Sequence, residues 1–219
     1  MKIRTTENLL DQVDQDFAWR KKELATLKLF IDRYQFKPRL LNTALRAGIT
    51  LLYAHWEGFL KTSSEYYLEF VSNQGAKNHQ LSDNFLALVA RKPINDIAAS
   101  ARVDQGLVIV DFFRRKLTEV ADVPHKDTIK TKSNLSSNVL RDISSTVGVN
   151  YSLFETKSAL IDERLLYKRN NVVHGQFLDL DVADFTEIYN EVTTMMETWR
   201  NELDNACVTK RYLNLISCP

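Results

Sequence analysis

Glycine and proline are scarce in this sequence, numbering six and four among 219 residues. Because turns between short strands commonly use these residues, their scarcity favours long helices. Cysteine is scarcer still: Cys207 and Cys218 are the two in the chain, and neither belongs to a CxxC pair. Two cysteines are too few for a disulfide framework or a zinc site.

The sequence also lacks a membrane signal and a charge excess. It contains no apolar run of membrane-spanning length and no signal peptide, so we expect a cytoplasmic protein without membrane contact. Basic and acidic residues number 29 and 28, which leaves a formal net charge of +1. Proteins that coat nucleic acid nonspecifically usually have a large basic excess. Any contact with nucleic acid must therefore be local.

Signatures of common catalytic classes are missing as well. The chain has no glycine-rich phosphate loop, no GxSxG elbow and no HExxH pair. Asp179, Asp181 and Asp184 could be interpreted as a metal-binding cluster, but further convergent ligands are absent. Carboxylates at a helix start more often accept bonds from free N–H groups and complement the helix dipole. We therefore expect no metal and no other cofactor.

Hydrophobic residues recur at steps of three and four, the pattern of amphipathic helices. This pattern predicts a first helix over about residues 6–36 and a long central helix that continues to about Asn73. Pro38 either ends the first helix or opens the second. Gly48 lies on the apolar stripe of the central helix, where it would let another backbone approach closely.

Two shorter helices are predicted next. Ser82 can cap a helix that runs through Val89, and Pro93 interrupts it because proline lacks the amide hydrogen that a helix needs. Residues 103–121 again have helical spacing. The run 107–113 is rich in valine and isoleucine and would also suit a strand.

A polar loop and three further helices complete the expected chain. The loop covers residues 122–134 and carries Lys126, Lys130 and Lys132, to which the pattern assigns no role. The helices are predicted over about residues 137–147 with a left-handed cap at Gly148, over about 154–172, and from near Asp181 onward. We expect one all-α domain over residues 1–219, a helical bundle with long central antiparallel helices. It would comprise an N-terminal helix (about 6–36) and a core (about 38–205).

The main candidate for chemistry is the segment Arg169-Asn170-Asn171-Val172-Val173-His174, which ends a predicted helix. It places a cation, an amide and a titratable imidazole at one helix terminus. The alternative interpretation is an exposed arginine and a histidine that complements the helix dipole. Lys168 before the segment, and His55 and Glu57 in the central helix, are supporting candidates. A histidine beside an apolar stripe, such as His55, is more often a core or rim residue with a hydrogen-bond partner.

The segment 169–174 resembles the motif of the HEPN superfamily, whose nuclease members carry an arginine, a polar residue and, after a short spacer, a histidine. The stretch Tyr53-Ala54-His55-Trp56-Glu57-Gly58-Phe59 and the closing amphipathic helix are similar to the MAE-type branch found in bacterial conflict systems. The resemblance extends over about residues 40–205.

The resemblance implies a HEPN-like helical bundle, a two-fold homodimer and metal-independent cleavage of RNA. Arg169, Asn170 and His174 would be the catalytic residues. The setting would be bacterial toxin–antitoxin or anti-phage defence, with an antitoxin or another defence-system protein as partner. One departure concerns this control: toxins silenced by a nucleotidyltransferase carry a tyrosine two residues after the histidine, where this chain has Gln176.

Simple chemistry agrees with this expectation. RNA carries its own nucleophile, the 2′-OH, so cleavage needs only proton transfer and stabilisation of charge on the phosphate. Histidine can transfer the proton, arginine can hold phosphate oxygens with two donors, and an asparagine can orient them. In a straight helix, however, Arg169 and His174 would lie about 140° apart. Either the helix unwinds near Asn171, or catalysis combines residues of two chains.

Two other functions stay open from the sequence. The chain could be a catalytically silent helical module that dimerises or binds a protein partner. It could also be an accessory subunit that binds a small ligand.

Overall fold

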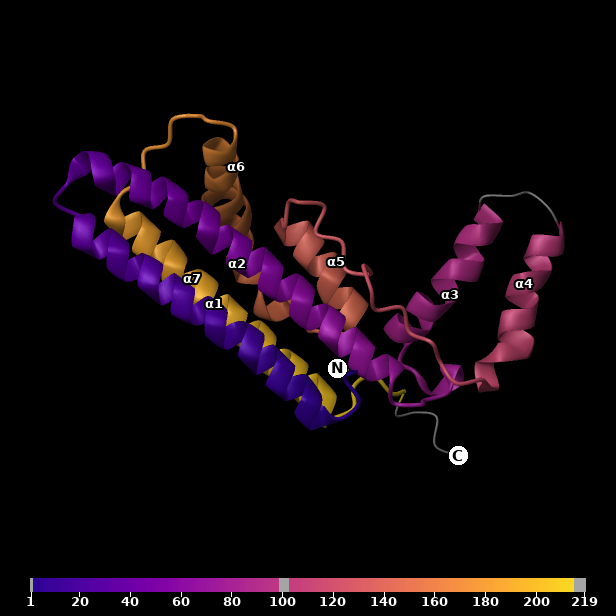
Figure 1. The fold of residues 1–219 in the computed structure, drawn as a ribbon. Helices are drawn as coiled ribbons and strands as arrows, with labels where there is room; N and C mark the ends of the chain where they lie inside the picture. The colour runs from indigo at the N-terminus through magenta and orange to yellow at the C-terminus, as the bar shows by residue number, and fades with distance from the viewer. Residues whose placement is uncertain (1, 99–102, 215–219) are drawn as a thin grey trace.

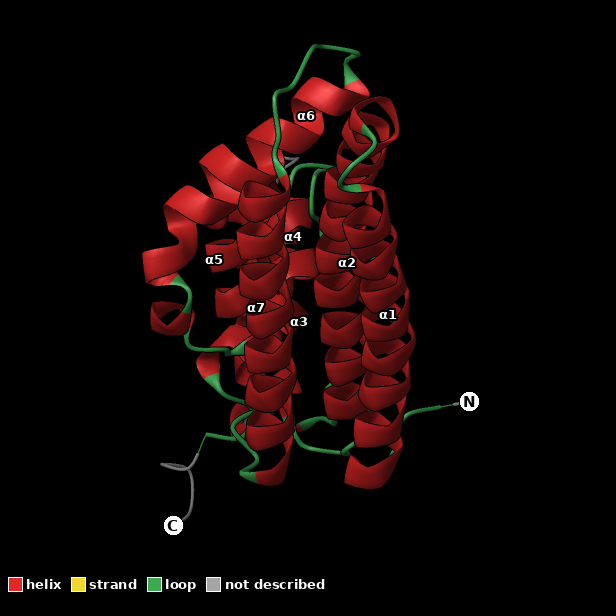
Figure 2. Cartoon of the chain, turned by 90° about the vertical axis from the view of Figure 1, so that its left-hand side faces the viewer, coloured by secondary structure: helices red, strands yellow, loops and turns green. Residues whose placement is uncertain are grey.

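The computed structural model describes residues 2–98 and 103–214. Three long helices lie side by side and form the body of the molecule (Figures 1 and 2). They are α1 (Thr6–Tyr34), α2 (Pro38–Ser72) and α7 (Val182–Val208). α1 runs antiparallel to α2 (Figure 1), and no β-strand occurs in the described ranges. The expected all-α bundle with long antiparallel helices is confirmed.

Local sequence explains where α1 and α2 begin. The Thr5 hydroxyl accepts a hydrogen bond from the Asn8 amide at 3.1 Å, which satisfies one free N–H in the first turn of α1. Pro38 is the first residue of α2. Its fixed φ suits a first helical turn, and its missing N–H has no helical partner there in any case. Pro38 therefore opens the second helix, one of the two roles that the sequence allowed.

One hydrophobic core joins the three long helices. Side chains of α1, α2 and α7 are fully buried in it, among them Leu24, Trp56 and Trp199. Gly48 lies where the three helices meet: a Cβ there would approach Ile31 Cδ1 to 2.9 Å and Phe185 Cε2 to 3.0 Å. The absent side chain thus makes room for two neighbouring side chains, where the sequence suggested a neighbouring backbone.

Two helices stand away from this body in Figure 1: α3 (Asp83–Ala98) and α4 (Val103–Arg114). The predicted interruption at Pro93 is wrong, because α3 continues through it. Proline lacks only its own amide hydrogen, so it removes one backbone hydrogen bond from this 16-residue helix. The run 107–113 is helical, so the strand alternative is also wrong. Short 3-10 turns, η1 (Asn78–Gln80) and η2 (Lys116–Thr118), lie at the base of these two helices.

α5 (Ser137–Val147) has the predicted bounds. The Ser136 hydroxyl accepts a bond from the Val139 amide at 3.3 Å, and Gly148 ends the helix with φ of +73°. The two ends of α5 are therefore determined by its own capping residues.

The helix predicted over about 154–172 is confirmed from residue 158 onward, but not as one regular α-helix. It runs without a break to Val173 as a π-helical stretch, η5 (Leu160–Leu166), followed by α6 (Tyr167–Val173). Two 3-10 turns precede it: η3 (Tyr151–Leu153) and η4 (Glu155–Lys157). Within η5 the carboxylate of Asp162 accepts bonds from the amide and hydroxyl of Ser137, at the start of α5. The Tyr167 amide bonds the Asp162 carbonyl, five residues back. π-Helical turns occur often at functional sites.

None of the helices in the described ranges is long and apolar enough to cross a membrane.

Candidate active site at the end of helix α6

His174 caps the C-terminal end of α6. Its amide donates to the Asn170 carbonyl at 2.9 Å, so helical bonding continues up to the histidine. Gly175 follows with φ of +71°, and its amide bonds the Val172 carbonyl at 3.1 Å. The Gln176 amide bonds the Asn171 carbonyl at 2.8 Å, which completes a Schellman cap. The helix therefore does not unwind near Asn171, one of the two alternatives from the sequence.

Arg169 is held along one edge. Its guanidinium lies over the Tyr53 ring, with 4.6 Å between the guanidinium carbon and the ring centroid. Nη1 donates to the Asn170 side-chain oxygen at 2.8 Å and, over a longer 3.4 Å, to the Ser133 carbonyl. Nε and Nη2 have no hydrogen-bond partner among the described residues. The free edge of this planar fork can bind two phosphate oxygens.

Tyr53 links Arg169 to the rest of the fold. Its hydroxyl accepts a hydrogen bond from the buried Leu135 amide at 2.6 Å. Burial raises the pKa of Tyr53 to about 12, helped by Glu57 and opposed by the Leu135 amide and Arg169. The phenol therefore stays protonated at neutral pH and positions the arginine. Tyr53 was not a predicted site residue, although it lies four residues before Glu57 and so shares its helix face.

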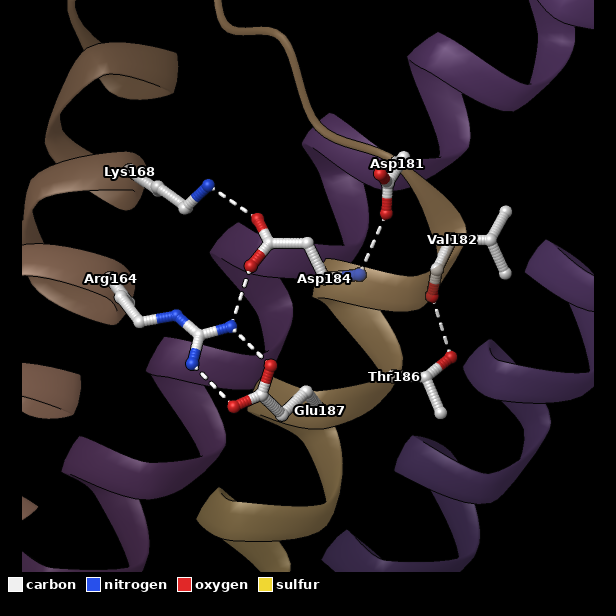
Figure 3. A network of polar contacts seen from close by, with 7 residues as sticks. All are labelled: Arg164, Lys168, Asp181, Val182, Asp184, Thr186 and Glu187. Atoms are coloured by element: carbon white, nitrogen blue, oxygen red, sulfur yellow. Dashed lines mark hydrogen bonds and ion pairs between the residues drawn. The ribbon is translucent and has the colours of Figure 1, made fainter.

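Lys168 is not available for phosphate in this structure. Its ammonium group donates to Asp184 at 2.5 Å, and Arg164 donates to the other oxygen of that carboxylate at 2.7 Å (Figure 3). Arg164 also binds both oxygens of Glu187, at 2.6 and 2.8 Å. Burial alone would raise the pKa of Asp184, but the bonds from Lys168 and Arg164 lower it overall. These ion pairs fix η5 and α6 against the first turns of α7.

Two of the three aspartates near residue 180, Asp181 and Asp184, have structural roles, as the sequence favoured. Asp181 is the N-cap of α7 and accepts the Asp184 amide at 2.7 Å (Figure 3). Asp184 is occupied by the ion pairs described above. Within residues 2–98 and 103–214, no group of three or more His, Cys, Asp or Glu side chains is placed to hold a metal ion.

His55 lies apart from the 169–174 segment. It is 3% exposed and faces α1, where Nε2 lies 2.7 Å from a Glu23 carboxylate oxygen. The imidazole also meets the Trp19 ring edge-on, at 5.2 Å between centroids. Burial lowers the pKa of His55, and the nearby Glu23 charge opposes part of that shift. Glu57 and Arg169 both lie near enough to Tyr53 to act on its pKa, whereas His55 faces a different helix.

The surface around His174 is exposed and partly apolar. Tyr167 is 60% exposed, Val173 55% and Phe177 83%. In helical projection Tyr167, Asn170 and His174 fall within about 60° of arc on α6. The His174 side chain has no hydrogen-bond or ion-pair partner in the part of the chain that the structure describes. The loop after it is tied to α2, because Arg46 donates to the Gln176 carbonyl at 2.8 Å.

A helical bundle with Arg-Asn-x-x-x-His at the end of a short helix has the features of the HEPN class of helical proteins. The model of the MAE_28990-like HEPN family matches residues 9–212, so the chain belongs to this HEPN family. The resemblance to the MAE-type branch is therefore confirmed, and HEPN membership supports a nuclease role in general. No curated protein and no solved structure matches the chain.

Proposed function

We propose that the protein is a metal-independent endoribonuclease that cleaves RNA by attack of the 2′-OH on the adjacent phosphate. The observation that carries the proposal is the arrangement of Arg169. Its guanidinium is held by Tyr53, Ser133 and Asn170, while Nε and Nη2 are free on the same short helix as the exposed His174. A pre-oriented donor fork can stabilise the negative charge that builds on the phosphate during cleavage.

Each motif residue has one role in this mechanism. His174 accepts the proton of the 2′-OH as that oxygen bonds to phosphorus, and Arg169 binds the non-bridging oxygens. The bond from phosphorus to the 5′-oxygen breaks, and an imidazolium returns a proton to that oxygen. Asn170 orients Arg169 through its side-chain oxygen. The products are a 2′,3′-cyclic phosphate and a 5′-OH.

The site is shared by two copies of the chain in this proposal. Since α6 stays helical to its end, the Cα–Cβ directions of Arg169 and His174 diverge by about 140°. A second copy packed on the exposed side chains Tyr167, Val173 and Phe177 would bring its own His174 toward the first Arg169. The homodimer and the RNA substrate are thus parts of one proposal.

The biological setting rests on family resemblance alone. We propose bacterial toxin–antitoxin or anti-phage defence, with an antitoxin or another defence-system protein as partner. Because Gln176 stands where the nucleotidyltransferase-silenced toxins have tyrosine, that mode of silencing is not part of the proposal.

The test is cleavage of 5′-labelled single-stranded RNA by purified protein in excess EDTA, with analysis of the product ends. We expect cyclic-phosphate and 5′-OH ends, and resistance of a substrate with 2′-methoxy groups. His174→Ala should lose about 10²- to 10⁴-fold in rate, the usual contribution of a proton-transfer group. Arg169→Lys should also lower the rate, because a point charge cannot reproduce the planar two-donor fork. Arg141→Lys is its matched control and should keep the wild-type rate, since Arg141 also lies 4.6 Å over a tyrosine ring.

Two outcomes would contradict the proposal in different ways. Cleavage that is lost in EDTA and restored by a divalent ion, or that leaves a 5′-phosphate, would show that another group attacks. A well-folded protein that dimerises or binds a partner protein but does not cleave RNA would favour the alternative, a catalytically silent helical module.

A further inference from the structure

The loop that carries the lysines ends against the arginine of the motif. The Ser133 carbonyl accepts from Arg169, and the Leu135 amide donates to the Tyr53 hydroxyl beneath that arginine. Preceding residues alternate in burial: Ile129 and Thr131 are buried, whereas Lys130 and Lys132 are exposed. The two lysines are therefore anchored close to the candidate active site, on a segment whose alternate side chains fix it to the core.

These lysines line a groove together with a cation from α3. The groove has a volume of about 370 Å³ and lies between the loop, Arg91 of α3 and the α5 residues Asp142, Ser145 and Thr146. Arg91, Lys130 and Lys132 bring three positive charges to it, against the single acidic side chain of Asp142. None of the three cations forms an ion pair with a described side chain, although Lys130 lies near enough to Glu65 to act on the pKa of that carboxyl group. Unpaired cations around a groove favour a bound anion.

The groove continues away from the motif. A neighbouring hollow of about 420 Å³ shares Arg91, Thr128 and Lys130 with it, extends to Asn95 and Pro124, and has one acidic side chain, Asp127. A chain of several phosphates could follow this path, whereas a single phosphate would occupy only part of it. Because the net charge of the whole protein is near zero, a polyanion needs a local cluster of this kind to bind.

We infer that Arg91, Lys130 and Lys132 form a phosphate-binding track that holds the RNA backbone on one side of the scissile phosphate. The inference rests on the proposed ribonuclease function. The track selects single-stranded RNA that extends several nucleotides beyond the cleavage site. It adds affinity through phosphates alone, so it contributes no base preference.

The test measures RNA affinity against salt concentration in the His174→Ala background, by fluorescence anisotropy of a labelled 12-nucleotide single strand. Lys130→Gln with Lys132→Gln should reduce the slope of log affinity against log salt by about 1.4, at about 0.7 per lost contact. Adding Arg91→Gln should bring the reduction to about 2.1. Lys22→Gln with Lys210→Gln is the matched control, because both side chains are exposed and without ion pairs among the described residues. It should leave the slope unchanged.

A second measurement separates the track from the chemistry. With an intact His174, the Lys130/Lys132 variant should cleave a dinucleotide as fast as wild type, because this substrate has no flanking phosphates. Its kcat/KM on the long strand should fall several-fold. Three results would overturn the inference. They are an unchanged salt slope in the Lys130/Lys132 variant, an equal reduction of the slope in the Lys22/Lys210 control, and an equal loss of kcat/KM on the dinucleotide and on the long strand. The anisotropy measurement requires no cleavage, so it tests the track even if the protein has no nuclease activity.

Discussion

The guanidinium of Arg169 lies over the ring of Tyr53, 4.6 Å from guanidinium carbon to ring centroid. The same tyrosine accepts the buried Leu135 amide through its hydroxyl. One side chain therefore has two separable tasks: its ring supports the arginine and its oxygen fixes the loop before α5. Substitutions that remove one task at a time can measure each.

Tyr53→Phe should keep the ring and lose the oxygen. We expect kcat/KM to stay close to wild type, since the cation–π contact remains. The free energy of unfolding should fall by about 1–3 kcal/mol, because the buried Leu135 amide loses its acceptor. Tyr53→Leu should in addition lower kcat/KM about tenfold, as a cation–π contact is worth about 1–2 kcal/mol. Urea denaturation and cleavage kinetics measure the two effects.

Tyr151→Leu is the control for this pair of variants. Tyr151 supports Arg141 at the same 4.6 Å but lies outside the candidate site. It should reduce stability and leave kcat/KM unchanged. Equal losses of activity in Tyr53→Leu and Tyr53→Phe would show that the ring does not position Arg169.

The parts of the fold that sequence could predict are those determined locally. The bounds of α5 follow from Ser136 and Gly148, which lie at its two ends and cap it by bonds to near neighbours. The π-helical stretch before α6 could not be predicted. Its Asp162 binds Ser137, 25 residues away, and sequence periodicity carries no record of that contact.

The candidate site, like the fold, has features that could be predicted from the sequence and features that could not. The segment 169–174 and its helix end at Gly175 were visible in the sequence, and family resemblance made the segment a candidate for catalysis. The support from Tyr53 and the pairing of Lys168 with Asp184 were not visible. Both depend on which faces of separate helices meet, and hydrophobic spacing does not encode which polar residues pair across that contact.

The shared-site proposal predicts complementation between two inactive variants. Arg169→Ala and His174→Ala homodimers should each be inactive. After unfolding and refolding together, half of the dimers would be mixed, and each would contain one site with both residues intact. We therefore expect about a quarter of wild-type activity in the mixture. No recovery, with mixed dimers verified by two affinity tags, would place Arg169 and His174 of one site in the same chain.

His55 should make stability depend on pH. Its folded-state pKa lies below the ordinary 6.5, so the unfolded chain takes up the proton first as pH falls. Its contribution to the free energy of unfolding is complete above about pH 6.5 and is lost as pH falls through the lowered pKa. The slope cannot exceed about 1.4 kcal/mol per pH unit. Urea titrations between pH 5 and 8 should show a flatter curve for His55→Gln.

Parallel curves for wild type and His55→Gln would mean that the groups around the imidazole, chiefly Glu23 with Arg20 and Asp16, balance its burial.

The Lys168–Asp184 pair distinguishes a structural lysine from one that binds RNA (Figure 3). If Lys168 ties α6 to α7, Lys168→Ala and Asp184→Asn should each lower the free energy of unfolding by about 1 kcal/mol. The double variant should lose less than the sum of the two. The Lys157–Glu191 pair, which joins η4 to α7 at 2.6 Å, is the matched control, and its removal should lower stability without lowering activity.

Both Lys168→Ala and Asp184→Asn should lower kcat/KM by similar factors, because either change releases the helix that carries Arg169 and His174. If instead Lys168→Ala alone reduced the salt dependence of RNA binding, the lysine would leave Asp184 for a phosphate when RNA binds.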